Sequence, residues 1–140
     1  VGDGDKYQEC EEIIAKKKLK RVNMVGYQMS IPYIDRASIL CITSVIEGLP
    51  TVFTEAMNLG VVPVGFDSFR AIYDMIDDGK NGFIIRDNDY KAYARTLIQL
   101  ATNDTLRHQI ASNAKQQKGN YDIEHIGPLW VKAFRKHGIV

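Results

Sequence analysis

Residues 38–65, with the sequence SILCITSVIEGLPTVFTEAMNLGVVPVG, decide the fold class. The run from Ser38 to Thr43 is almost entirely apolar, which is typical of a strand buried on both faces of a sheet. A helix is expected to begin at Pro50 or Thr51, because proline favours the first helical position, and to end at Gly60, because glycine commonly follows a helix end. Further apolar residues follow at once, so the stretch indicates a strand–helix–strand unit.

The same alternation extends in both directions. Residues 61–65 predict a second buried strand, although Pro63 argues against a central place in the sheet, because proline cannot donate a ladder hydrogen bond. Strands that alternate with helices indicate a Rossmann-like parallel sheet with helices on both faces, in one domain over residues 1–140. The other expected elements are a strand end at Val1, a helix from Asp5 to about Lys18, a strand at 21–25, a brief helix from Ser30 to Arg36, a helix at 71–76, a turn at 78–82, a strand at 83–85, helices at 90–101 and 104–118, and a last helix from Asp122 to Arg135 interrupted at Pro128.

Composition excludes several classes of function. The chain has 18 basic and 17 acidic side chains, so no overall field attracts nucleic acid. Cys10 and Cys41 lie on apolar patterns and are expected to be buried; their spacing gives no zinc site and no disulfide framework. We therefore expect a cytoplasmic protein with no metal and no other cofactor.

The loop after Thr43 carries the candidate chemistry, because ligands of parallel sheets bind beyond the carboxyl ends of the strands. Glu47 follows the strand end, and Glu55 lies in the second turn of the next helix. Carboxylates suit sugar and ribose hydroxyls, whereas the helix N-terminus between them suits an anion such as a diphosphate. Gly48 permits close approach of the backbone to a ligand. The backbone donors would come from Leu49, Thr51 and Val52.

From spacing alone, a simpler interpretation stays open. Glu47 could be a solvated loop carboxylate, and Glu55 a carboxylate favoured near the positive end of a helix.

A family resemblance favours the functional interpretation. Ser44-x-x-Glu47-Gly48-Leu49-Pro50-x-x-x-x-Glu55-Ala56-Met57 resembles the Glu-x7-Glu signature of family 4 glycosyltransferases, retaining enzymes of the GT-B fold also called "glycosyl transferases group 1". The chain resembles their C-terminal, nucleotide-sugar-binding domain over nearly its whole length. Further similar segments are residues 21–27, 78–85 and 97–107.

The resemblance implies transfer of a hexosyl unit from a nucleotide-sugar donor to an acceptor, usually without a metal. Glu47 would contact the donor sugar as the candidate catalytic residue, and Glu55 would bind the ribose hydroxyls. The remaining candidate donor-binding residues are Gly48, Leu49, Thr51 and Val52 around the sugar and β-phosphate, and Gly26 and Tyr27 around the base.

The resemblance also implies missing parts. In the family, a strand and a helix with diphosphate-binding Arg and Lys precede the position of Val1, as does an N-terminal acceptor domain. We therefore expect a fragment, truncated at its N-terminus, with little or no transferase activity alone.

Residues 65–72 resemble the branch that builds bacterial surface polysaccharides. This favours a UDP-sugar donor over a GDP-sugar and a glycan or lipid-linked acceptor. Peripheral association of the full enzyme with the inner face of the membrane is compatible with such an acceptor. The rival hypotheses are a non-catalytic nucleotide-binding or regulatory doubly wound domain, and another nucleotide-sugar enzyme on the same architecture.

Overall fold

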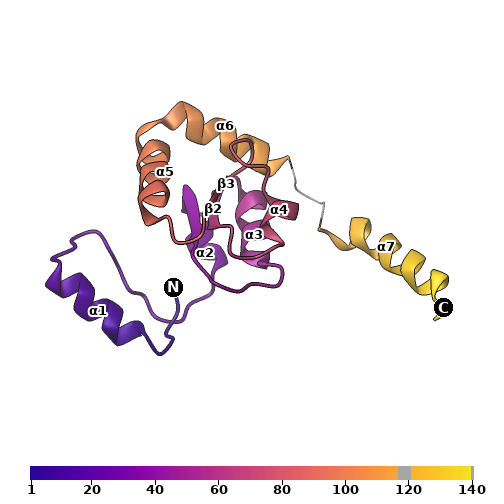
Figure 1. Cartoon of the computed structure of the whole chain (residues 1–140), viewed down its shortest axis with the longest axis horizontal. Helices are drawn as coiled ribbons and strands as arrows, with labels where there is room; N and C mark the ends of the chain where they lie inside the picture. The colour runs from indigo at the N-terminus through magenta and orange to yellow at the C-terminus, as the bar shows by residue number, and fades with distance from the viewer. Residues whose placement is uncertain (117–120, 140) are drawn as a thin grey trace. The chain divides into compact units, whose positions relative to one another are not determined.

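A computed structural model describes residues 1–116 and 121–139 of the chain. The residues form two compact units, Val1–Tyr33 and Ile34–Val140, and each is described by itself. Figure 1 shows the elements of both units. The expected end of a helix at Lys118 lies outside the described residues.

The N-terminal unit contains one long helix, α1 (Tyr7–Lys16), none of whose residues is buried. Its position agrees with the prediction, but the prediction that Cys10 is buried is wrong, because this thiol is exposed. The strand predicted at 21–25 is also wrong, since these residues form no strand. A strand needs a neighbouring strand with which it forms a ladder of hydrogen bonds. Here the start of the chain is joined to the end of this segment by one backbone hydrogen bond, from Gly2 N–H to the Gly26 carbonyl at 2.7 Å.

Three parallel strands form the centre of the second unit, in the order β1–β2–β3. The register places Ile39 opposite Val62 and Val64 opposite Phe83. This arrangement confirms the predicted α/β class with a parallel sheet. The bounds are β1 Ile39–Ile42, β2 Val62–Phe66 and β3 Phe83–Ile85, with α2 Ile31–Ile34, α3 Thr51–Leu59, α4 Ile72–Met75, α5 Tyr90–Thr102, α6 Asp104–Lys115 and α7 Ile123–Lys136.

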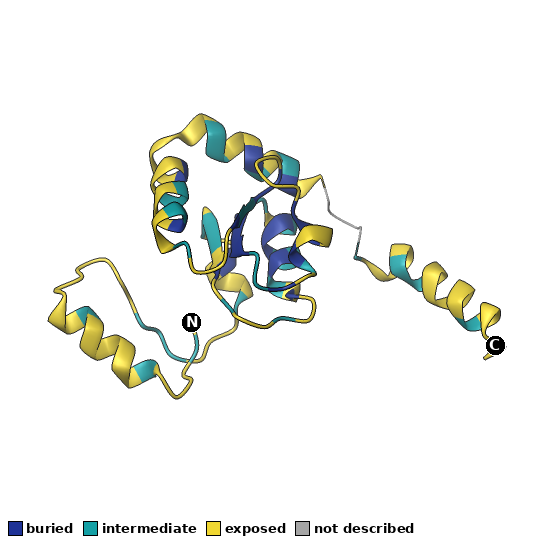
Figure 2. Cartoon of the chain, viewed as in Figure 1, coloured by how far each residue is buried: buried dark blue, intermediate teal, exposed yellow. Residues whose placement is uncertain are grey.

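Buried residues lie in the sheet and in the helix segments beside it (Figure 2). The two faces of the sheet have separate apolar clusters. On one face, α5 and α6 pack on alternate residues of β2 through Tyr93, Leu100 and Ile110. On the other, α3 and α4 contribute Phe53 and Ile72 to the second cluster. All five residues of β2 are buried, so the central strand determines where both layers of helices lie.

β1 is less buried than its sequence predicts. Within the described residues it pairs with β2 alone and is therefore an edge strand. Its burial decreases accordingly, and the thiol of Cys41 is exposed. The predictions that this strand is covered on both faces and that Cys41 is buried are wrong for the described structure, because one edge of β1 has no neighbouring strand.

Pro63 lies in the central strand, contrary to the expectation from its missing N–H group. Val62 N–H donates to the Ser38 carbonyl at 3.1 Å, on the side of β1. Because successive residues of a strand direct their backbone groups to opposite sides, the backbone nitrogen of Pro63, which carries no hydrogen, faces β3. β3 begins only opposite Val64, so no ladder bond is lost. The ring of Pro63 lies close to Gly82, which has no side chain to exclude it.

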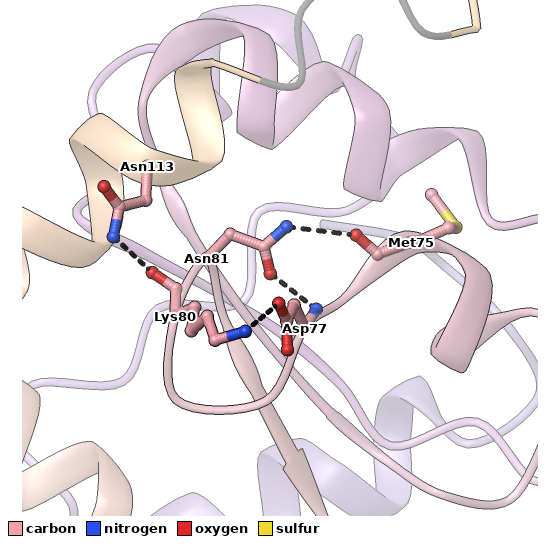
Figure 3. A network of polar contacts seen from close by, with 5 residues as sticks. All are labelled: Met75, Asp77, Lys80, Asn81 and Asn113. Atoms are coloured by element: carbon pink, nitrogen blue, oxygen red, sulfur yellow. Dashed lines mark hydrogen bonds and ion pairs between the residues drawn. The ribbon is translucent and has the colours of Figure 1, made fainter.

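The turn that leads into β3 is built around a buried amide, Asn81 (Figure 3). Its Oδ1 accepts a hydrogen bond of 2.7 Å from Asp77 N–H, and its Nδ2 donates to the Met75 carbonyl at 3.3 Å. Asn113 of α6 donates to the Lys80 carbonyl at 2.8 Å, which joins the turn to the opposite layer. Both halves of the Asn81 amide are therefore satisfied, as a buried polar group requires.

α7 is an amphipathic helix with no buried residue. Pro128 lies inside it without ending it. Trp130 is 58% exposed, and its ring lies 5.5 Å from that of Phe134. None of the helices in residues 1–116 and 121–139 combines the length and apolar character needed to cross a bilayer.

We expect Gly82→Ala to destabilise the second unit by about 1–3 kcal/mol. A Cβ at Gly82 would lie 2.7 Å from Pro63 Cγ and 2.8 Å from the Pro63 carbonyl oxygen, and that backbone cannot yield without moving β2. Urea unfolding followed by far-UV circular dichroism measures the change.

The matched control is Gly127→Ala in α7, where a Cβ would meet Ile123 at an ordinary 3.6 Å. Alanine favours a helix over glycine, so this variant should lose no stability. Equal unfolding midpoints for Gly82→Ala and the wild type would contradict the packing described for Pro63.

Candidate functional site

The loops that leave the three parallel strands meet at the carboxyl edge of the sheet and are joined by hydrogen bonds. Ser68 Oγ donates to the Ser44 carbonyl at 2.5 Å, which connects the loops after β2 and β1. Asp67 Oδ1 accepts from Asp87 N–H at 2.5 Å, and Asp67 N–H donates to the Ile85 carbonyl at 2.8 Å. The candidate site is therefore built on loops that are held to one another.

Glu47 lies in the loop between β1 and α3 and is half-buried. Its carboxylate has no hydrogen bond or ion pair with any residue in the described part of the chain. Val45 and Ile46 before it are 73% and 86% exposed, whereas Pro50 is buried. Glu47 is thus held between an exposed turn and a fixed helix start, with its oxygens available to a ligand.

The start of α3 presents free backbone donors. Pro50 is the N-cap residue and provides no side-chain acceptor. The first hydrogen bond of the helix runs from Phe53 N–H to the Pro50 carbonyl at 2.9 Å. Within the described residues, the N–H groups before it donate to no acceptor, and such groups favour an anion. The amides of Leu49, Thr51 and Val52 are among these groups, and their binding of a donor stays a prediction.

Close packing fixes α3 against the sheet. A Cβ at Gly65 of β2 would lie 3.0 Å from the Phe53 ring and 2.9 Å from Ile72 Cδ1. Glu55 follows Phe53 by two positions and is half-buried, outside the buried face of the helix. It lies one turn beyond Thr51, so the two residues share a face. Glu47, Gly48 and Glu55 therefore all belong to one segment whose helix is rigidly placed.

Gly26 and Tyr27 belong to the N-terminal unit. Gly26 has φ +67°, a left-handed conformation that glycine accommodates, and Tyr27 is 79% exposed. Their participation in a common site with Glu47 and Glu55 stays a prediction.

Tyr93 is a residue of this edge that the sequence interpretation missed. Its hydroxyl donates to the Val64 carbonyl, in the middle of β2, at 2.8 Å and lies 3.5 Å from the carbonyl of Ile42, the last residue of β1. Burial, with a smaller contribution from the nearby Cys41 thiol, raises the pKa of Tyr93 well above its usual range. The hydroxyl therefore stays protonated and donates. The sequence offered one indication that Tyr93 is buried, which is its position on the apolar face of the helix predicted at 90–101.

The hollow below α4 has the wrong charge for a diphosphate. It has a volume of about 530 Å³, and its lining includes four aspartates, which repel an anion. The aspartates that line the hollow are Asp67, Asp74, Asp77 and Asp78.

No group of three or more acidic, histidine or cysteine residues within 1–116 and 121–139 is arranged to hold a metal ion.

Comparison with known proteins identifies a family of sugar-transferring enzymes. Residues 1–117 match the family model "Glycosyl transferases group 1", and the chain belongs to this family. Its structural neighbours are GT-B glycosyltransferases, which confirms the predicted fold class.

Individual relatives are also glycosyltransferases. The chain is 30% identical, over 94% of its length and 37% of the relative's, to a Campylobacter jejuni α-1,4-N-acetyl-D-galactosaminyltransferase that acts on a diNAcBac-PP-undecaprenol glycan. It is 29% identical to a Staphylococcus aureus poly(ribitol-phosphate) α-N-acetylglucosaminyltransferase, over 95% of the chain and 28% of the relative. The crystal structure of TarM superposes with a TM-score of 0.87 at 29% identity, over 95% of the chain and 27% of TarM. The chain thus spans about a third of these relatives' length.

We expect Tyr93→Phe to lower the free energy of unfolding by about 1–2 kcal/mol, because the buried hydrogen bond from the hydroxyl to the Val64 carbonyl would be lost. Tyr90→Phe is the matched control. Its ring also packs on Phe66, with the ring centroids 5.4 Å apart, but its hydroxyl is exposed and, within the described part of the chain, donates to Asn88 Oδ1 alone. Urea denaturation of both variants should show a loss for Tyr93→Phe alone. Equal losses would contradict a role for the buried hydroxyl.

Proposed function

We propose that this chain is the donor-binding half of a retaining glycosyltransferase that moves a hexosyl unit from a UDP-sugar to a glycan or lipid-linked acceptor. One observation carries the proposal: two half-buried carboxylates, Glu47 and Glu55, flank a helix start whose backbone N–H groups are unused. Carboxylates accept hydrogen bonds from hydroxyls, and free amides bind the phosphate between them.

The proposed roles follow from this chemistry. As the glycosidic bond to the diphosphate breaks, negative charge develops on the leaving group and positive charge on the sugar ring. The N–H groups of Leu49, Thr51 and Val52 would stabilise the leaving diphosphate without rearrangement, since the packing of α3 already holds them. Glu47 would orient the sugar and offset the positive charge, and Glu55 would bind the ribose. Gly48 would let the backbone approach the sugar closely.

UDP is the proposed nucleotide of the donor. The structure of an S. aureus TarM mutant was solved with UDP, fondaparinux and α-GlcNAc-glycerol, and it is 29% identical to this chain. A GDP-sugar is the alternative. The proposed reaction needs no metal or other cofactor, because backbone amides serve as the anion-binding groups.

Because the chain spans 37% and 28% of its two curated relatives, we propose that an acceptor-binding half completes the catalytic centre. The chain alone would then bind donor with little or no transferase activity. By their names, one relative acts on an undecaprenol-linked glycan and the other on poly(ribitol-phosphate). This supports a place at the cytoplasmic face of the membrane.

Calorimetric titration of the chain with UDP, GDP and UDP-N-acetylglucosamine tests the proposal. Glu55→Gln should weaken UDP and the UDP-sugar equally, by about ten- to a hundredfold, because both ligands carry the ribose hydroxyls. Glu47→Gln should weaken the UDP-sugar by a similar factor and leave UDP unchanged, because this carboxylate contacts only the sugar.

Glu124→Gln, on the exposed surface of α7, is the matched control and should change neither affinity. If a folded sample binds no nucleoside diphosphate, the non-catalytic, regulatory alternative is favoured over donor binding.

A further inference from the structure

The segment that carries Glu47 is the loop between β1 and α3. Residues 43–50 belong to no helix or strand. Among the described residues, the one hydrogen bond that holds them to another loop is that from Ser68 Oγ to the Ser44 carbonyl, at 2.5 Å. The direction in which the chain leaves β1 therefore depends on a hydroxyl that comes from the loop after β2.

Ser68 is itself firmly placed. Asp67, before it, donates through its N–H to the Ile85 carbonyl and accepts from Asp87 N–H through its carboxylate. Phe69, after it, is 5% exposed and packs in the apolar cluster that also contains Phe53 of α3. With both neighbours restrained and its own side chain half-buried, Ser68 presents its hydroxyl in a fixed direction.

We propose that Ser68 is a positioning residue of the donor site, which holds Glu47 in place through the Ser44 carbonyl without touching the donor. Glu47 is three residues beyond Ser44, a reach of about 10 Å of extended chain. Without the restraint at Ser44, the exposed turn at Val45 and Ile46 could carry the carboxylate away from the start of α3. The inference rests on the proposed role of Glu47 in donor-sugar binding.

Loss of the Ser68 hydroxyl should weaken binding of the donor sugar and not binding of the nucleotide. Glu55 and the amides of α3 are placed by the contact of Phe53 with Gly65, which Ser68 does not make. Ser68→Ala should therefore leave the affinity for UDP nearly unchanged. It should weaken UDP-N-acetylglucosamine by about fivefold, the equivalent of one neutral hydrogen bond. A general loss of folding would weaken both ligands together.

Two measurements on the full chain test the proposal. The first is backbone amide ¹⁵N relaxation of residues 45–49 without ligand, for wild type, Ser68→Ala and Ser68→Thr. We expect order parameters near 0.85 in the wild type, a fall below about 0.6 in Ser68→Ala, and recovery in Ser68→Thr, which keeps a hydroxyl. The second is calorimetric titration of the same variants with UDP and UDP-N-acetylglucosamine.

Two controls separate other causes. Ser112→Ala removes an exposed hydroxyl of α6 and should change neither measurement. Asp67→Asn removes a charge next to Ser68 but keeps an oxygen that can accept from Asp87 N–H, so residues 45–49 should stay ordered. Circular dichroism verifies that each variant is folded.

The outcomes separate this inference from the proposed function. Unchanged order parameters for residues 45–49 in folded Ser68→Ala would overturn the inference, whatever the ligands do. A selective loss of order with UDP and UDP-sugar weakened equally would also overturn it, because Glu47 would not have been the residue affected. If the wild type binds neither ligand while Ser68→Ala loses order, the restraint by Ser68 stands and the proposed function fails.

Discussion

The contact between the Phe53 ring and the backbone at Gly65 is the constraint on which the second unit depends. A Cβ at Gly65 would lie 3.0 Å from that ring, so the distance between α3 and β2 is set by the absence of a side chain. Because the same helix carries Glu55 and begins with the free amides, this apolar contact also places the groups proposed to hold the donor. Packing on the face away from the ligand thus determines the geometry on the face toward it.

Local patterns predicted much of this arrangement. The strand–helix–strand unit of residues 38–65 was predicted correctly because each of its boundaries depends on neighbouring residues. Pro50 begins α3, and Gly60, with φ +75°, ends it. Glu47 and Glu55 could be named for the same reason: both lie within one helix turn of a boundary that the sequence marks, and the motif of the glycosyltransferase family spans the pair.

The incorrect predictions share a different cause, since they depend on residues far apart in the chain. The segment at 21–25 has no partner strand among the described residues, and Cys41 is exposed because β1 has a neighbour on one side only. Pro63 is tolerated in the central strand because β3 begins one residue later. The hydrogen bonds of Ser68 and Tyr93 span 24 and 29 residues or more, and no periodicity in the sequence indicates which carbonyl a distant hydroxyl will reach.

Trp130 is the only tryptophan of the chain, and it lies on α7, where no residue is buried. The tryptophan fluorescence of this protein therefore reports the surroundings of α7 rather than those of the sheet, of α3 or of the loop that carries Glu47. An emission spectrum that stays constant during titration or heating would carry no information about the donor site or its core. Conversely, a shift in emission on addition of another macromolecule would identify α7 as the surface in contact.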